Sequence, residues 1–114
     1  MLQHTDGSGT HFDLMIDQGE TLATWKFAAP PENAARIPSV GTRIGDHRRA
    51  YLDYEGPVSG NRGRVARHDQ GTCLVVDQAP AAWTIEFRGG RLSGRYTLTL
   101  CAGADQSWCL RSGG

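Results

Sequence analysis

The sequence predicts an all-β fold, a compact single-domain β-barrel over residues 1–114 with about eight short strands and little helix. Apolar and polar residues alternate with period two in several short segments, which is typical of half-buried strands. Turn signals rich in Gly, Pro, Asn and Asp recur about every 8–12 residues. Neither a heptad pattern nor a long amphipathic segment interrupts this spacing, so we expect one all-β domain.

The first two predicted strands form a hairpin. Residues 11–17 alternate, with Phe12, Leu14 and Ile16 on one face and His11, Asp13, Met15 and Asp17 on the other. Gln18-Gly19 offers a turn, and residues 21–28, rich in Thr, Trp and Phe, return as the second strand. The following Pro30-Pro31 ends that strand, and residues 33–36 are predicted to form one helical turn.

Six further strands are predicted after this turn. Gly-, Pro- and Asn-containing breaks separate them, and Gly89-Gly90 is a two-residue hairpin signal. The predicted strands are residues 42–48, 62–68, 72–77, 82–88, 92–101 and 107–111. The three Trp residues, Trp25, Trp83 and Trp108, fall within predicted strands and are expected in the core.

Composition and charge restrict the class of protein. No apolar run approaches the roughly 18 residues of a membrane helix, so no membrane association is expected. The N-terminus shows no secretory signal, and three Cys without a Cys-x-x-Cys pair fit a reducing compartment, which predicts a cytoplasmic location. The net charge is zero, but residues 36–67 carry seven Arg against three acids. Arg binds phosphate in a bidentate fork, so this region favours a phosphate-containing partner.

The strand at residues 11–17 also carries candidate chemistry. Opposite its apolar face, His11 and Asp13 point the same way, about 7 Å apart along the strand. A third candidate, His47, lies in the predicted strand 42–48. Two imidazoles and a carboxylate with open coordination positions suit a divalent metal ion. A solvated polar face of an outer strand is the alternative interpretation of the same pattern.

Several motifs resemble one known family. Residues 11–16, His-Phe-Asp-Leu-Met-Ile, are similar to the His-Tyr-Asp-Leu-Arg-Leu signature of the 3′-phosphoesterase domain attached to bacterial DNA ligase D. Further matches follow in the family's order: Thr24-Trp25, Asp46-His47, Tyr51, Asp53-Tyr54-Glu55-Gly56, Asp69-Gln70-Gly71-Thr72, Leu92-Ser93-Gly94-Arg95-Tyr96 and Ser107-Trp108-Cys109-Leu110. The resemblance therefore extends, with gaps, over nearly the whole chain.

This resemblance implies a manganese-dependent phosphoesterase that trims a 3′-phosphate or 3′-ribonucleotide from DNA ends in repair. By matching position, His4, Asp13 and His47 would be the metal ligands, and His11 and Tyr51 would contact the scissile phosphate. Expected partners are DNA 3′ ends and a separate DNA ligase or polymerase, and the protein is expected to be a monomer.

Other basic residues are candidates for phosphate binding. Arg48 is adjacent to His47, and Arg62 and Arg64 lie in or beside a Gly- and Asn-rich loop, so each could supply a cation to the site.

Two alternatives remain open. Met15 and Ala29 stand where the family has an Arg and a Lys, which favours a catalytically lapsed module that binds a DNA end or a repair partner. The His-x-Asp pattern with a distant His is also the facial arrangement of non-haem iron oxygenases.

Overall fold

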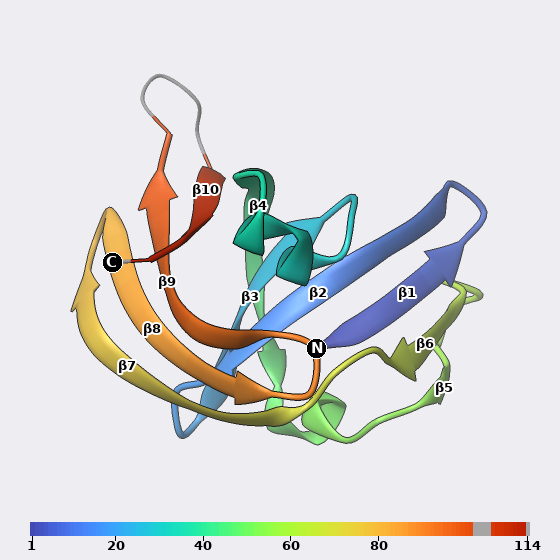
Figure 1. The fold of residues 1–114 in the computed structure, drawn as a ribbon. Coiled ribbons are helices and arrows are strands. Elements are labelled where there is room, and N and C mark those ends of the chain that lie inside the picture. Colours follow the sequence, from blue (N-terminus) through green and yellow to red (C-terminus); the bar gives the residue numbers. More distant parts are fainter. Residues whose placement is uncertain (102–105, 114) are drawn as a thin grey trace.

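The computed structural model describes residues 1–101 and 106–113, and these form one antiparallel sheet of ten strands (Figure 1). The order across the sheet is β5-β6-β1-β2-β3-β4-β10-β9-β8-β7. The strands are β1 (Leu2–Asp6), β2 (Gly9–Asp17), β3 (Thr21–Phe27), β4 (Ser39–Arg48), β5 (Gly56–Pro57), β6 (Arg64–Arg67), β7 (Gly71–Ala79), β8 (Ala82–Gly89), β9 (Ser93–Leu100) and β10 (Ser107–Ser112). Two short 3₁₀ helices complete the fold, η1 (Pro31–Ala35) and η2 (Arg49–Leu52).

The all-β prediction is confirmed, but the closed barrel of about eight strands is wrong. The sheet is open, because its edge strands β5 and β7 do not pair with each other among the residues that the structure describes. Alternation in the sequence reveals strands but not their non-local partners, and here β4 pairs with the distant β10. None of the helices in the described ranges is long and apolar enough to cross a membrane.

The two strands that the sequence analysis missed are β1 and β5. β1 has one apolar residue, Leu2, and polar side chains at its other four positions. It therefore lacks the alternation of apolar and polar residues by which the other strands were predicted. β5 consists of Gly56 and Pro57, a pair that is typical of a turn. The helical turn predicted at residues 33–36 corresponds to η1.

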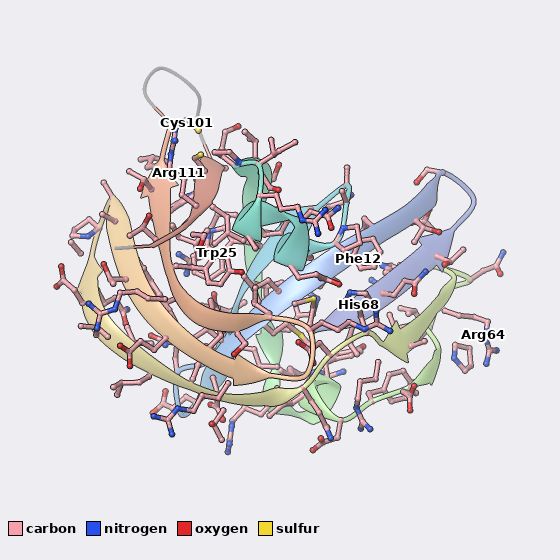
Figure 2. All side chains as sticks on the ribbon, viewed as in Figure 1. Phe12, Trp25, Arg64, His68, Cys101 and Arg111 are labelled. Carbon is pink, nitrogen blue, oxygen red and sulfur yellow. The ribbon has the colours of Figure 1, made fainter. Side chains whose placement is uncertain are left out.

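The main core lies between the two halves of the bent sheet (Figure 2). Trp25 in β3 is fully buried and packs edge-on against Trp83 in β8, with ring centroids 5.0 Å apart, and against Trp108 in β10 at 5.7 Å. Register shifts at Leu22/Thr24 and at Val75/Asp77 are consistent with this bending, since bulges increase local twist. The prediction that the three Trp residues form the core is confirmed.

A second, smaller apolar cluster covers the opposite face of β2. Its buried members are Leu2, Met15, Leu22 and Val65, and Tyr51, Leu52, Tyr54 and Val58 pack against them. β2 is therefore buried on both faces, with the segment from η2 to β6 lying over its outer face. This second layer determines the surroundings of Asp13, which shares that face.

Close packing at Gly41 in β4 gives a stability prediction. A Cβ added there would lie 2.6 Å from Cε1 of the buried Phe27 ring, so Gly41→Ala is expected to destabilise the fold by about 1–3 kcal/mol through overpacking. Gly45→Ala in the same strand is the matched control, because its Cβ would meet no placed atom within 4 Å. Urea unfolding of both variants checks this, and equal midpoints would contradict it.

Candidate active site

The β1–β2 hairpin and β4 bring four of the predicted residues onto one face of the sheet. In the register of the hairpin His4 is directly opposite His11, and Asp13 follows two residues later on the same face of β2. β3 separates β2 from β4, where His47 is opposite Leu22 beside a register shift. Asp13 is 3% exposed, so the interpretation of this face as a solvated outer surface is wrong at its centre.

Four side chains form a continuous row across this face. His4 Nδ1 lies 3.2 Å from His11 Nε2, and His11 Nε2 lies 3.3 Å from Asp13 Oδ1. The other carboxylate oxygen, Asp13 Oδ2, lies 3.6 Å from His47 Nε2. Donor atoms held about 2.1 Å from a common cation are spaced about 3.0–3.5 Å apart, so these separations resemble neighbouring ligands of one ion.

Backbone carbonyls fix the orientation of two of the imidazoles. His4 Nε2 lies 2.6 Å from the carbonyl of Arg62, and His47 Nδ1 lies 3.2 Å from the carbonyl of Gly45. A carbonyl can only accept, so each of these nitrogens donates its proton. In the neutral rings the remaining nitrogens, His4 Nδ1 and His47 Nε2, therefore offer lone pairs toward the row, as in metal-ligating His residues held by second hydrogen bonds.

The buried carboxylate of Asp13 is incompletely satisfied. Oδ1 is fully buried and has no hydrogen-bond partner in the described part of the chain, although His11 Nε2 lies 3.3 Å away. A buried carboxylate oxygen without a partner is costly unless a cation approaches it. One carboxylate oxygen and two imidazole lone pairs are ligands that Mn²⁺, Fe²⁺ and Zn²⁺ accept, so the donor chemistry of His4, Asp13 and His47 fits a divalent ion, although in the described chain their donor atoms do not all lie within 4.8 Å of one another.

The pKa values of two imidazoles move in opposite directions. The Asp13 carboxylate raises the pKa of His47, chiefly through hydrogen bonding to the protonated ring. Burial lowers the pKa of His11, and the positive charge of Lys26 acts in the same direction, against the attraction of Asp13. Near neutral pH the His11 ring is therefore largely uncharged and carries one N–H.

A pocket of about 300 Å³ opens over this row. Six of the site residues predicted from the sequence line this pocket: His4, Asp13, His47, Arg48, Arg62 and, from η2, Tyr51. The Tyr51 ring packs edge-on against His47, with centroids 5.7 Å apart, and the Arg48 guanidinium lies 5.8 Å from the same ring. His11 does not line this pocket but touches it through His4 and Asp13.

The three predicted arginines are not equivalent. Arg62 lines the pocket, but its guanidinium donates to the Ser59 carbonyl and hydroxyl, and its own carbonyl holds His4. Arg48 lines the pocket from the end of β4. Arg64 lies on the other face of β6 from the buried Val65, beside Gln3 and Thr5, and Figure 2 places it at the edge of the fold. The structure therefore does not bring Arg64 to the other site residues in the described chain.

Asp6 is a site residue that the sequence analysis did not identify. In the described ranges, His4, Asp6 and His11 form the group whose ligand atoms all lie within 4.8 Å of one another. His4 and Asp6 are two residues apart in β1 and therefore lie on the same face of the strand. This spacing would have identified Asp6 if residues 2–6 had been predicted as a strand. The Asp6 carboxylate also accepts hydrogen bonds from the Ser8 amide and hydroxyl, which lower its pKa.

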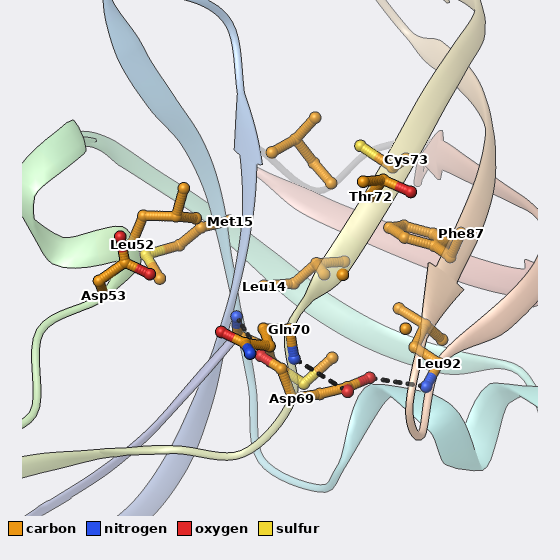
Figure 3. A pocket seen from close by; sticks show the side chains of 14 residues that line it. Leu14, Met15, Leu52, Asp53, Asp69, Gln70, Thr72, Cys73, Phe87 and Leu92 are labelled. Carbon is orange, nitrogen blue, oxygen red and sulfur yellow. Dashed lines mark hydrogen bonds between the residues drawn. The ribbon is translucent and has the colours of Figure 1, made fainter.

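Another pocket, of about 340 Å³, lies beside β2 and β7 (Figure 3). Its walls are largely apolar, with Leu14, Phe87 and Leu92 among them. None of the residues predicted to bind metal or phosphate lines it. We therefore place the candidate site at the His4–Asp13–His47 pocket.

Comparison with known proteins identifies the family of this chain. A model of the family described as the DNA Ligase D 3′-phosphoesterase domain matches residues 3–100 of the 114-residue chain. A search of the curated proteins found no match. The matched region contains the row of His and Asp residues, the lining of its pocket except Leu2, and most of the sheet. The chain therefore belongs to the DNA ligase D 3′-phosphoesterase domain family.

Proposed function

We propose that this protein is a metal-dependent phosphoesterase that trims a 3′-phosphate or a 3′-ribonucleotide from DNA ends during repair. The observation that carries the proposal is the buried Asp13 carboxylate in the lining of this pocket: its Oδ1 has no hydrogen-bond partner in the described residues, and its Oδ2 lies 3.6 Å from Nε2 of His47, which lines the same pocket. Membership of the 3′-phosphoesterase family supports the reaction class.

In this proposal His4, Asp13 and His47 hold a divalent cation, with Mn²⁺ as the expected ion. A bound cation would neutralise negative charge on the phosphate and on the departing oxygen. The carbonyls of Arg62 and Gly45 keep the two imidazoles in the tautomer with a free inward lone pair. Arg48, exposed at the pocket rim, would add a positive charge for the incoming phosphate.

His11 and Tyr51 would contact the reacting phosphate directly. Because burial lowers the pKa of His11, its neutral ring would serve chiefly as an N–H donor to a phosphate oxygen. The Tyr51 hydroxyl, in the lining of the pocket, would donate a second hydrogen bond. Two oriented donors would hold the phosphate and favour the charge that develops in the transition state.

The catalytically lapsed binding module remains a second candidate, and one observation favours it. Met15, at the family's Arg position, is 6% exposed and packs in the second apolar cluster with Leu2 and Val65. No guanidinium therefore reaches the pocket from this position of β2. Such a module would bind DNA ends without turnover.

End-processing assays separate the two candidates. Wild-type protein with Mn²⁺ is expected to release phosphate from a 3′-phosphorylated DNA strand. Loss of one hydrogen bond to a charged oxygen in Tyr51→Phe is expected to lower kcat/KM by about 10- to 100-fold, and His11→Ala by about 10²- to 10⁴-fold. Tyr96→Phe, in the main core, is the control and is expected to retain activity.

A wild-type protein that binds DNA but leaves both a 3′-phosphate and a 3′-ribonucleotide intact would exclude the enzyme and favour the binding module. Action together with a separate DNA ligase or polymerase, a monomeric state and a cytoplasmic location are further parts of the proposal. Size-exclusion chromatography with light scattering tests the monomeric state.

A further inference from the structure

A second hollow adjoins the candidate site on the outer face of β2, β3 and β4. It has a volume of about 500 Å³ and is lined by Ser8, Gly9, Thr10, His11, Lys26, Ala28, Val40, Thr42 and Ile44. His11 lies between the two, because it lines this hollow and also lies 3.2 Å from His4 and 3.3 Å from Asp13, which line the first pocket. The hollow and the first pocket therefore lie next to each other on one face of the sheet.

Lys26 supplies the positive charge of this hollow. It is the one Lys in the sequence, and in the register of the sheet it is directly opposite Asp13. Directly opposite residues of antiparallel strands project to the same face, so Lys26 lies on the face of the candidate site. The charge of Lys26 also affects His11. Burial is the largest cause that lowers the pKa of His11, and the positive charge of Lys26 lowers it further, against the attraction of Asp13.

Lys26 is also available to an anionic ligand. Arg43 and Arg49, on the neighbouring segments, are paired with Asp46 and Asp17. Lys26 has no ion-pair partner within the ranges that the structure describes, and its side chain is exposed. The nearby Asp6 carboxylate is occupied by two hydrogen bonds from Ser8.

The remaining walls combine hydroxyl and apolar groups. Thr42 is opposite Lys26 on β4, and Val40, two residues away on the same face, is 63% exposed. A cation beside a hydroxyl suits a phosphodiester, and an exposed aliphatic side chain next to it suits a sugar or the face of a base.

We propose that this hollow binds the nucleotide that precedes the 3′ terminus, and that Lys26 pairs with the last internucleotide phosphate of a single DNA strand. The proposal rests on the proposed function only in placing the strand's 3′ end at the His4–Asp13–His47 pocket. Lys26 is a substrate-binding residue in this arrangement. Its positive charge is provided from β3, whereas the family's Arg would be at the position of Met15 in β2.

The first test measures DNA binding without turnover. Fluorescence anisotropy of a short 3′-phosphorylated single strand in EDTA is recorded over a range of NaCl concentrations. Lys26→Met is expected to weaken binding by about two- to fivefold at low salt and to reduce the slope of log Kd against log[salt] by about 0.7. Lys26→Arg is expected to retain the slope, and Arg88→Met, an exposed cation in β8, is the control.

The second test identifies the phosphate. A strand with an uncharged methylphosphonate at its last internucleotide linkage is expected to bind wild type as weakly as the normal strand binds Lys26→Met. The two changes together are expected to cost no more than either alone. Additive losses, or an unchanged salt slope in Lys26→Met, would overturn the proposal.

These readouts do not depend on catalysis. A wild-type protein without phosphoesterase activity would overturn the proposed function but leave the binding comparison of Lys26→Met and wild type intact. Conversely, active enzyme whose Lys26→Met variant binds every strand like wild type would retain the proposed function and exclude this binding site.

Discussion

Asp13→Asn is expected to abolish stoichiometric Mn²⁺ binding, measured by isothermal titration calorimetry on wild type and variant. The amide keeps the shape of the side chain but removes the one buried negative charge of the row formed by His4, His11, Asp13 and His47. Without that charge, two neutral imidazoles must hold a dication alone. The same change is expected to lower phosphoesterase activity by at least about 10³-fold, because charge stabilisation at the phosphate is lost.

The stability of the metal-free protein distinguishes this effect from misfolding. Asp13 Oδ1 is buried without a hydrogen-bond partner in the described residues, so the neutral amide is expected to leave the metal-free Tm unchanged or slightly higher. Mn²⁺ is expected to raise the Tm of wild type and not that of Asp13→Asn. These two results together would mean that the Asp13 carboxylate does not stabilise the metal-free protein but is needed to bind the ion.

Asp17→Asn is the matched control, because Asp17 lies on the same face of β2 but pairs with Arg49. It is expected to retain Mn²⁺ binding. Wild-type affinity in Asp13→Asn, or equal loss in Asp17→Asn, would contradict the assignment of the metal site.

Local patterns in the sequence predicted the centre of this site. Period-two alternation at residues 11–17 places His11 and Asp13 on one face, as the structure has them, because side-chain direction in a strand follows from spacing alone. The predicted strand at residues 42–48 offered His47, and the resemblance to a known family added His4 and Tyr51; all three line the same pocket as Asp13. Neither required knowledge of how distant strands pair.

The remaining features depend on contacts between distant parts of the chain. The His4 ring is held by the carbonyl of Arg62, 58 residues away, and no local pattern reports such a contact. Arg64 and Val65 alternate on β6, and only the pairing of β6 with β1 determines which of them faces the site. The open sheet has the same cause, since the pairing of β4 with β10 leaves β5 and β7 as edges.

Met15 lies on the same face of β2 as His11 and Asp13, but the second apolar cluster covers that part of the face. The sequence placed it beside His11 and Asp13, and that placement is correct. The row of His and Asp side chains does not continue to Met15, however, because Met15 is buried against Leu22 and Val65 in the second apolar cluster. Alternation therefore showed that residues 11–17 form a strand but not that its second face is also partly buried, because the pattern assumes that one face is solvated.

A different carboxylate, Asp69, joins two distant turns. Between β6 and β7, its Oδ1 accepts from the amides of Gln70 and Gly90 at 2.9 and 2.8 Å. Its Oδ2 accepts from the amides of Arg91 and Leu92 at 3.0 and 2.8 Å. Figure 3 shows this carboxylate reaching from the β6–β7 connection to the β8–β9 turn. Four backbone donors thus converge on one side chain.

Asp69→Ala is expected to lower the free energy of unfolding by about 3 kcal/mol and the Tm by roughly 10 °C, because several charge-assisted hydrogen bonds are lost and their donors are left unpaired. Asp69→Asn is expected to lose nearly as much, since its NH₂ group would face two backbone N–H donors. Asp77→Ala on the exposed edge strand β7 is the control and is expected to change stability by less than about 0.5 kcal/mol. Thermal and urea unfolding check all three.

The pH dependence of this difference identifies its cause. Burial alone would raise the pKa of Asp69, but the four backbone hydrogen bonds outweigh it and the pKa is lowered. A carboxyl whose folded pKa is depressed stabilises the fold above its unfolded pKa of about 3.9 and loses this contribution as the pH falls through its folded pKa. The stability gap between wild type and Asp69→Ala is therefore expected to be full at pH 7 and to narrow below about pH 4. A gap that stays constant into acid would mean that the loss comes from packing, because an apolar contact does not depend on the charge of the carboxylate.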